Sequence, residues 1–193
     1  LVGALVVGVA FAKGLCFATG LPFIGVNHLE GHLYANRYVD PMLEPPFIAL
    51  LVSGGHTMLV HVKGWGDYAV LGSTLDDAVG EAFDKVAKAL ELGYPGGPIL
   101  SKLARDGDAK AINFPRAMMH SGDLQFSLSG LKTAVITYIN EQRKAGMDID
   151  IPNLAASFTA AIVDVLVAKS LDACKQAGVD VLCIGGGVAA NPD

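Results

Sequence analysis

The sequence predicts an α/β fold built around an open β-sheet. Three apolar strands follow one another closely between residues 47 and 73, and a segment of helical period comes directly after them. Towards its end the chain has a long apolar helix, 152–177, a buried strand, 179–184, and a glycine turn. Strands and helices combined in this order are typical of α/β proteins, whose open sheets usually bind ligands at the carboxyl ends of their strands.

The N-terminal part predicts a helix, a strand and a second helix. Residues 1–19 are small or apolar on all sides, so we expect a fully buried helix that stops at Gly20. Residues 21–26 have the composition of a short buried strand, and Asn27 can cap the helix that follows. Three prolines between residues 38 and 46 indicate a connection, and we place a lobe boundary there.

The second lobe begins with an apolar strand, 47–52, which turns at Ser53-Gly54-Gly55. At Thr74 the period changes to that of a helix, and Thr74 and Asp77 have capping-box spacing. The other elements that we expect are strands 56–62, 68–73 and 179–184, and helices 98–105, 126–143 and 152–177, the last ended by Gly178. The predicted domains are 1–46, the remainder of a first lobe, and 47–193, a second lobe with a helical insertion at about 95–150.

Composition limits the class of protein. A hydrophobic fraction of 52% in 193 residues is enough to bury a sizeable core. The net charge of −5 and the pI near 5.4 argue against a dedicated basic nucleic-acid module, although a local patch or a partner could supply phosphate contacts. The three cysteines form no Cys-x-x-Cys pair and suggest a reducing compartment.

The apolar beginning of the chain does not predict a membrane span. Lys13 and Pro22 interrupt it, and neither uncharged piece reaches the roughly 18 to 20 residues that a span requires. The chain opens without a basic start, and it stops directly after a glycine turn. We therefore expect that both ends are cut from a longer protein.

His28 and His32 are the best candidates for a metal site. Four residues of a helix turn by roughly 400°, which puts both imidazoles on one face with Cβ atoms about 6 Å apart. This spacing suits two ligands of one metal ion, and two ordinary histidines near a helix start are the alternative. Glu30 would lie roughly 200° from His28, unlike the carboxylate of the zinc-protease motif His-Glu-x-x-His.

Three glycine-rich turns are candidates for a nucleotide site. The turn Ser53-Gly54-Gly55 presents backbone N–H groups that can bind an anion, although most such turns only connect strands. Residues 93–98 could let the backbone approach a ligand or could be a plain connector. Residues 185–191 follow a buried strand and can accommodate a base or a ribose against their backbone.

Three carboxylates, Asp77, Glu81 and Asp84, recur on one side of the predicted helix. A solvated acidic face is the simpler explanation of this spacing. The functional alternative is a carboxylate that accepts hydrogen bonds from ribose hydroxyls. Lys132 could likewise meet a phosphate or be an ordinary solvated lysine.

The sequence contains six specific motifs in a fixed order. They are residues 28–32 (HLEGH), 52–57 (VSGGHT), 76–86 (DDAVGEAFDKV), 94–98 (YPGGP), 126–134 (FSLSGLKTA) and 185–191 (GGGVAAN). In this order they resemble the motifs of the universal tRNA threonylcarbamoyladenosine transferases, a family once described as O-sialoglycoprotein endopeptidases. The resemblance covers essentially the whole chain.

This resemblance implies the actin/Hsp70/hexokinase (ASKHA) fold, with two ribonuclease-H-like lobes around a nucleotide cleft and an incomplete first lobe here. It implies metal-dependent transfer of the L-threonylcarbamoyl group from threonylcarbamoyl-AMP to N6 of the adenosine next to the anticodon, in tRNAs that read codons starting with A. The implied metal ligands are His28 and His32. The implied substrate-binding residues are Leu51, Val52, Ser53, Gly54, Gly55, Asp84, Gly97 and Asn191.

The resemblance also implies cofactors and partners. The metal would be one divalent ion, iron by resemblance or else zinc, and ATP or ADP could occupy the adenylate site. The partners would be tRNA, a smaller paralogue of the same fold and an ATPase, in the cytoplasm and without a membrane. A local patch that could assist tRNA binding contains Lys132, Arg143 and Lys144.

Some of the family pattern lies outside this chain. Relatives begin with a strand that carries an early acidic residue, and they supply a further aspartate metal ligand beyond residues 185–191. The sequence shows no evident general base. Leu51 and His56 make the chain look bacterial.

Two other functions are open at this point. A nucleotide-binding scaffold that assembles with other subunits would need no metal, and the apolar helix 1–19 could contribute to its interface. A metalloprotease would follow the older description of the family, but the position of Glu30 disfavours activation of a metal-bound water.

Overall fold

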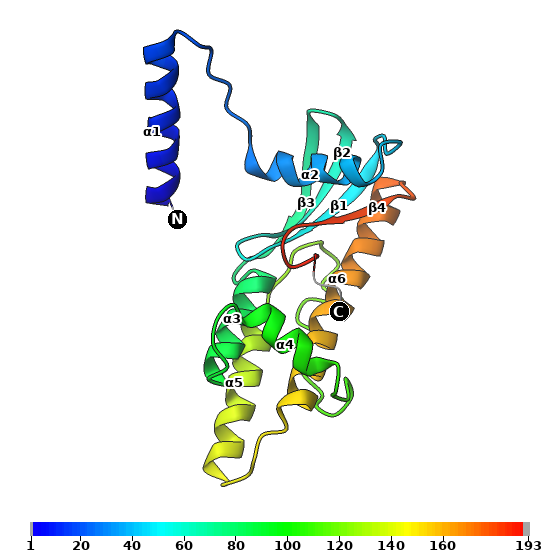
Figure 1. The fold of residues 1–193 in the computed structure, drawn as a ribbon. Coiled ribbons are helices and arrows are strands. Elements are labelled where there is room, and N and C mark those ends of the chain that lie inside the picture. Colours follow the sequence, from blue (N-terminus) through cyan, green and yellow to red (C-terminus); the bar gives the residue numbers. More distant parts are fainter. Residues whose placement is uncertain (1, 191–193) are drawn as a thin grey trace. The chain divides into compact units, whose positions relative to one another are not determined.

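The structure is a computed structural model that describes residues 2–190 (Figure 1). It divides into two compact units, Leu1–Gly31 and His32–Asp193. Its helices are α1 (Val2–Thr19), α2 (His28–Val39), α3 (Val79–Ala89), α4 (Gly96–Ala104), α5 (Ser129–Lys144) and α6 (Ile151–Ala177). Its strands are β1 (Phe47–Val52), β2 (Thr57–Gly64), β3 (Asp67–Ser73) and β4 (Leu182–Gly185). The predicted α/β class is confirmed, and the predicted lobe boundary after residue 46 stays a prediction.

The first unit contains α1, which is helical as predicted but is not buried. None of the residues described for α1 is buried, and Phe17 is 93% exposed. A helix that is apolar on all sides needs neighbours on all sides, and beyond α1 its own unit contains residues 20–31. Within that unit Lys13 Nζ lies 5.9 Å from the ring centroid of Phe23. The prediction of a fully buried helix was therefore wrong for the part of the chain that the structure describes.

Residues 21–26 have no regular secondary structure, so the predicted strand there was wrong. A strand needs a neighbouring strand for its backbone N–H and C=O groups. The described residues of the first unit contain no other strand that could supply this pairing.

Helices α1 and α6 are both long and apolar enough to cross a membrane, judged by length and composition alone. Helix α1 is continuous and meets this length and composition although it contains Lys13, which was expected to interrupt the apolar stretch. The core helices of globular domains pass the same test, and α6 is such a helix because much of its surface is packed against β1, α4 and α5.

The second unit is organised around β1. The sheet has the order β3-β2-β1-β4, in which β1 pairs antiparallel with β2 and parallel with β4 (Figure 1). The β1–β2 register runs from Phe47 opposite Val62 to Val52 opposite Thr57. Every residue of β1 is buried, as expected for a central strand that is covered on both faces.

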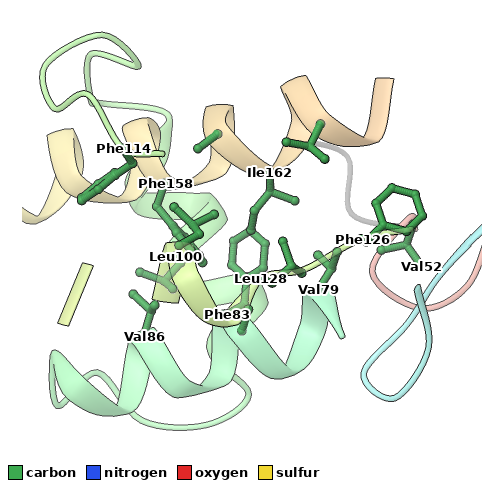
Figure 2. Packing of buried hydrophobic residues seen from close by; sticks show 14 of the residues in the cluster. Val52, Val79, Phe83, Val86, Leu100, Phe114, Phe126, Leu128, Phe158 and Ile162 are labelled. Atoms are coloured by element: carbon green, nitrogen blue, oxygen red, sulfur yellow. The ribbon is translucent and has the colours of Figure 1, made fainter. Parts of the chain in front are cut away.

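The two faces of β1 contact different helices. Ile48, Leu50 and Val52 belong to the main hydrophobic core, which is completed by α3, α4, α5 and α6. Figure 2 shows this core, in which Phe83 of α3 meets Phe158 of α6 at a ring-centroid distance of 5.0 Å. Residues of β1 alternate between faces, so Phe47, Ala49 and Leu51 point the other way.

Helix α2 lies on that second face. Its Leu33 is only 3% exposed, and its Tyr34 ring stacks on Trp65, which follows β2, at 4.6 Å. Arg37 lies 5.2 Å above the same Trp65 ring and pairs with Glu44 at 2.7 Å. These contacts hold residues 33–37 of α2 against Trp65 in the turn between β2 and β3.

Helix α3 begins later than the sequence predicted. It starts at Val79, and its N-cap residue, Ala78, provides no side-chain cap. Thr74 and Asp77 do not form a capping box: the Thr74 hydroxyl donates to the Asp77 carbonyl at 2.8 Å and closes a turn before the helix. Thr74 and Asp77 thus interact at the predicted spacing, but their hydrogen bond forms a turn that precedes the helix.

The long helix α6 agrees with its sequence signals at both ends. The Asp150 side chain accepts a hydrogen bond from the Asn153 N–H at 3.0 Å, as an N-cap does. Gly178 has a left-handed backbone, with φ of 65°, and ends the helix. Both ends use residues that are close in sequence, and both were predicted to within a residue.

Candidate functional site

The first turn of α3 brings two of the predicted glycine turns together. The Gly80 N–H donates to the Ser53 carbonyl at 3.2 Å. A Cβ atom placed on Gly80 would lie 2.7 Å from Gly54 Cα and 3.0 Å from Val188 Cγ2. No side chain fits there, because the backbone of Ser53 and Gly54 and the side chain of Val188 meet the helix at this point. The 53–55 turn and the turn after β4 therefore meet at Gly80.

The turn after β4 is held directly against the end of β1. The Val188 N–H donates to the Val52 carbonyl at 3.1 Å. Gly186 has φ of +105°, and a Cβ atom there would lie 2.3 Å from the same carbonyl oxygen. Only glycine adopts this conformation without strain at such close range. Asn191, predicted to bind substrate from this turn, lies outside the described residues.

The 53–55 turn is closed by its own residues and open to solvent. The Ser53 N–H donates to the His56 carbonyl at 2.8 Å, and the His56 N–H donates to Ser53 Oγ at 3.0 Å. Gly54 and Gly55 are exposed, and a Cβ on either would meet nothing within 4 Å. A ligand could therefore approach this backbone. Leu51 and Val52, predicted with the turn, are buried strand residues that hold it in place.

Asp84 fixes the third glycine turn. It lies four residues after Gly80 on α3, and its Oδ1 accepts a hydrogen bond from the Gly96 N–H at 2.7 Å. A Cβ on Gly96 would lie 2.6 Å from Ala87 Cβ and 2.8 Å from Asp84 Cα, so α4 starts in direct contact with α3. Gly97 is the second residue of α4, and a Cβ there would meet nothing within 4 Å. The Asp84 carboxylate and Gly97 thus lie next to each other at the start of α4.

The three carboxylates predicted to share one helix face do not do so. Asp77 precedes α3 and is only 8% exposed, between two lysines: its Oδ1 and Oδ2 accept from Lys85 Nζ and Lys132 Nζ, each at 2.6 Å. Burial alone would raise the pKa of the Asp77 carboxyl, but the hydrogen bonds from the two lysines lower it below its ordinary value. Glu81 pairs with Lys85 at 2.7 Å on the surface of α3.

Asp76 is the most strongly stabilised carboxylate of this region. Its Oδ2 accepts from the Ser127 and Ser129 hydroxyls at 2.6 Å each, and its Oδ1 accepts from the Leu128 N–H at 2.8 Å. Burial alone would raise its pKa, but these hydrogen bonds lower the pKa to about 2. Asp76 is therefore ionised at neutral pH and binds the start of α5.

The histidine pair lies on a helix, as predicted. Helix α2 begins at His28, and the Asn27 side chain caps it by accepting from the Leu29 N–H at 2.9 Å. The His32 carbonyl oxygen lies 3.4 Å from a Cβ placed on Gly185, at the carboxyl end of β4. His32 is therefore close to the edge of the sheet from which the glycine turns extend.

Two imidazoles at this spacing fit as two ligands of a divalent metal. A structural zinc site would have four ligands, and a catalytic site usually has three from the protein. Within residues 2–190 there is no group of three histidine, cysteine, aspartate or glutamate side chains that could hold a metal ion. The role of His28 and His32 as metal ligands therefore stays a prediction.

The predicted basic patch on α5 is largely neutralised. Lys132 is bound to Asp77, and the Arg143 guanidinium lies 3.2 Å from Glu91 and from the Ala89 carbonyl. Of the predicted group, Lys144 is exposed at the end of the helix. This arrangement leaves little positive charge for a phosphate backbone on α5.

Three residues that hold the site together, Gly80, Gly96 and Asp76, were not among the predicted site residues. Gly80 and Gly96 allow backbone contacts, and Asp76 anchors a segment that lies about 50 residues further along the chain. A signal for Gly80 was present, because a glycine inside a helical pattern usually has a packing reason. Nothing local marks Asp76, whose partners are distant in sequence.

Comparisons with known proteins identify the family of the chain. The sequence profile of the tRNA N6-adenosine threonylcarbamoyltransferase family matches residues 1–193. Curated proteins of that name are 54% identical in Clostridium botulinum (strain 657 / Type Ba4), 51% in Clostridioides difficile (strain 630) and 50% in Clostridium perfringens (strain SM101 / Type A). Each match covers 99% of this chain and 56% of the relative, so the chain spans little more than half of their length. The chain belongs to the tRNA N6-adenosine threonylcarbamoyltransferase family, and its α/β unit is part of that family's actin/Hsp70/hexokinase-type fold.

Proposed function

We propose that the full-length protein transfers the L-threonylcarbamoyl group from threonylcarbamoyl-AMP to N6 of the adenosine next to the anticodon, in tRNAs that read codons starting with A. The observation that carries this proposal is the meeting of the glycine turns on α3, in a chain that matches the family over its whole length. The printed name of the relatives, tRNA N6-adenosine threonylcarbamoyltransferase, supports the reaction.

The adenylate would bind across α3. The exposed backbone at Gly54 and Gly55 would receive the phosphate, because N–H groups of a glycine turn form a concave anion site. Asp84 holds Gly96 through Oδ1, and its Oδ2 would accept hydrogen bonds from the ribose hydroxyls. Gly97 and Asn191 would complete this site, and ATP or ADP would occupy it in place of the substrate.

In the reaction the adenosine N6 amine forms a bond to the carbamoyl carbon, and the bond from that carbon to the phosphate oxygen breaks. AMP leaves with the electron pair, and N6 loses a proton to a base that the described residues do not identify. The backbone N–H groups of the 53–55 turn would stabilise the negative charge that develops on the leaving phosphate. Because this turn is fixed to β1 and to Gly80, its donors need no rearrangement during the step.

His28 and His32 would hold a divalent metal, iron by family resemblance or else zinc. Such an ion supplies Lewis acidity towards a carbamoyl or phosphate oxygen. A metalloprotease is disfavoured because α2 is a regular helix, in which Glu30 is turned roughly 200° from His28. We place the remaining ligand in the part of the relatives' length that lies outside this chain.

The proposed partners are tRNA, a smaller paralogue of the same fold and an ATPase, all in the cytoplasm. The neutralised lysine and arginine of α5 suggest that most phosphate contacts to tRNA come from elsewhere in the full-length protein or from these partners. Binding of tRNA that does not weaken with added salt would contradict a role for phosphate contacts.

The test is reconstitution of the full-length protein with its partners, threonylcarbamoyl-AMP and substrate tRNA, followed by mass analysis of the tRNA nucleosides. We expect threonylcarbamoyladenosine from the wild type and none from His28→Ala. Full activity of that variant would exclude the metal role. Tight nucleotide binding and complex formation with no product in any condition would favour a scaffold and refute the transferase.

A further inference from the structure

Asp77 joins two helices through one buried carboxylate. Its side chain is 11% exposed and accepts from Lys85 of α3 and from Lys132 of α5 at 2.6 Å each. The Lys132 side chain is itself only 21% exposed. A carboxylate shielded from water in this way interacts more strongly than a surface pair, and removing it leaves two ammonium groups without their shared partner.

Asp76 adds a second attachment to α5, one turn away. The N-cap residue of α5, Leu128, gives no side-chain cap, and Asp76 fills this role from a distant part of the chain. The N–H of Ser129 also donates to Asp76, at 3.2 Å. Attachments at the start of the helix and at Lys132 fix both the position and the rotation of α5 relative to residues 76–77.

The same segment is attached to the glycine turn on its other side. The Val79 N–H donates to Thr57 Oγ1 at 2.9 Å, and the Gly80 N–H donates to the Ser53 carbonyl at 3.2 Å. Thr57 is 1% exposed. Residues 76–80 therefore connect α5 to the 53–55 turn through hydrogen bonds, of which the Val79–Thr57 bond is buried, and through an ion pair.

Lys85 also lies next to Asp84, the residue of α3 that is proposed to bind the ribose. It lines a surface hollow of about 550 Å³ together with Asp84, Glu81 and Tyr94. The Lys85 ammonium pairs with Asp77 at 2.6 Å and with Glu81 at 2.7 Å. Without Asp77, its remaining partner within the helix is Glu81, and the position of α3 relative to α5 loses its central ion pair.

We propose that Asp77 is a positioning residue of the adenylate site. It acts through Lys85 and Lys132: it holds α3 against α5 so that Gly80 and Asp84 keep the glycine turns in their binding arrangement. This inference rests on the proposed function, because it assumes that an adenine nucleotide binds to these turns.

The experiment measures ADP affinity of the full-length protein by calorimetry. We expect Asp77→Asn to raise the Kd for ADP roughly tenfold, the size of effect that residues behind a binding site produce. Lys132→Met should weaken binding in the same direction, whereas Lys132→Arg, which keeps the charge, should restore it to within roughly twofold. Glu81→Gln is the matched control, because it removes the exposed partner of Lys85 and leaves both bonds of Asp77.

Turnover supplies a second readout that a purely structural role would not give. In the reconstituted reaction, KM for threonylcarbamoyl-AMP should rise in Asp77→Asn while kcat changes by less than about twofold, because no group at the reacting atoms is altered. If Asp77→Asn does not fold, Lys132→Met takes its place in both measurements.

The outcomes separate this inference from the function on which it rests. A folded Asp77→Asn variant with wild-type ADP affinity and KM would overturn the positioning role while leaving the transferase intact. A wild-type protein that binds neither ADP nor threonylcarbamoyl-AMP would refute the adenylate site itself, and the positioning role with it.

Discussion

Helices α3 and α2 both carry residues predicted to bind, but the protein holds them in different ways. Helix α3 is in contact with backbone on two sides, at Gly80 and at Gly96, and its approach is tied to α5 by Asp76 and Asp77. On α2 the spacing of the histidines comes from the helix itself, and its attachment is made by side chains: Leu33 is buried, and Tyr34 and Arg37 contact Trp65.

These two kinds of attachment give the two helices different rigidity. A helix held by backbone contacts cannot shift without moving the turns it touches, so the residues proposed to bind the adenylate are pre-organised. A helix held by one buried leucine, a ring stack and a surface ion pair can adjust at a smaller energetic cost than a helix held by backbone contacts. We therefore expect substitutions on α3 to be severe and those on α2 to be mild.

The largest effect is expected for Gly80→Ala. Its methyl group would be placed 2.7 Å from Gly54 Cα and 3.0 Å from the Ser53 carbonyl, where backbone must shift. Overpacking of this kind costs about 1 to 3 kcal/mol, and we expect a loss of about 2 kcal/mol in the free energy of unfolding together with weaker nucleotide binding. Urea unfolding and ADP titration of the full-length protein measure both. Wild-type values in both would show that the turns do not depend on this contact.

A smaller effect is expected for Asp84→Ala. It leaves the buried Gly96 N–H without its acceptor, which costs about 1 to 2 kcal/mol. Amide hydrogen exchange should become faster in residues 93–98 and stay unchanged in α2. Asp84→Asn keeps an acceptor oxygen and is the control; equally fast exchange in that variant would assign the effect to the charge.

The sequence allowed the strands, the glycine turns and the ends of α6 to be predicted because their signals are local. An apolar run of six residues and a following Ser-Gly-Gly define β1 and its turn, and Gly178 defines the end of α6. The failures all depended on partners elsewhere in the fold. The strand expected at 21–26 has no strand to pair with, and Asp77, expected on the face of α3, is buried by Lys132 from α5.

The residues of the candidate site likewise fall into two groups, those predicted from local motifs and those found only in the structure. Leu51 to Gly55, Asp84 and Gly97 were predicted from their motifs, and the structure brings their segments together. The residues that produce this arrangement, Gly80 and Asp76, act through contacts that are not visible in any short stretch of sequence.

A pH dependence is expected from Asp76. Its pKa is lowered from 3.8 to about 2 in the folded protein, so the folded state binds fewer protons than the unfolded state between these values. The stabilisation is fully present above about pH 4 and is lost as the pH falls towards 2. Because Asp76 is exposed and solvent screens its interactions, we expect a contribution of at most about 1 kcal/mol to the free energy of unfolding. Acid unfolding of Asp76→Asn should lack this component of the pH dependence, and an unchanged profile would contradict the role of Asp76 as the cap of α5.

The smallest effect, and one of opposite sign, is expected on α2. Gly31 lies inside this helix between the two histidines, and a Cβ there would meet nothing within 4 Å. Alanine is favoured over glycine in a helix interior by about 0.5 to 1 kcal/mol, so Gly31→Ala should stabilise α2 slightly. The same substitution thus distinguishes the two helices, since it is destabilising at Gly80 and stabilising at Gly31. Slower amide exchange in α2 with unchanged ADP affinity is the expected result. A loss of stability at Gly31 as large as that at Gly80 would mean that α2, too, is held by close backbone contacts, and the contrast between a rigid adenylate helix and an adjustable histidine helix would fail.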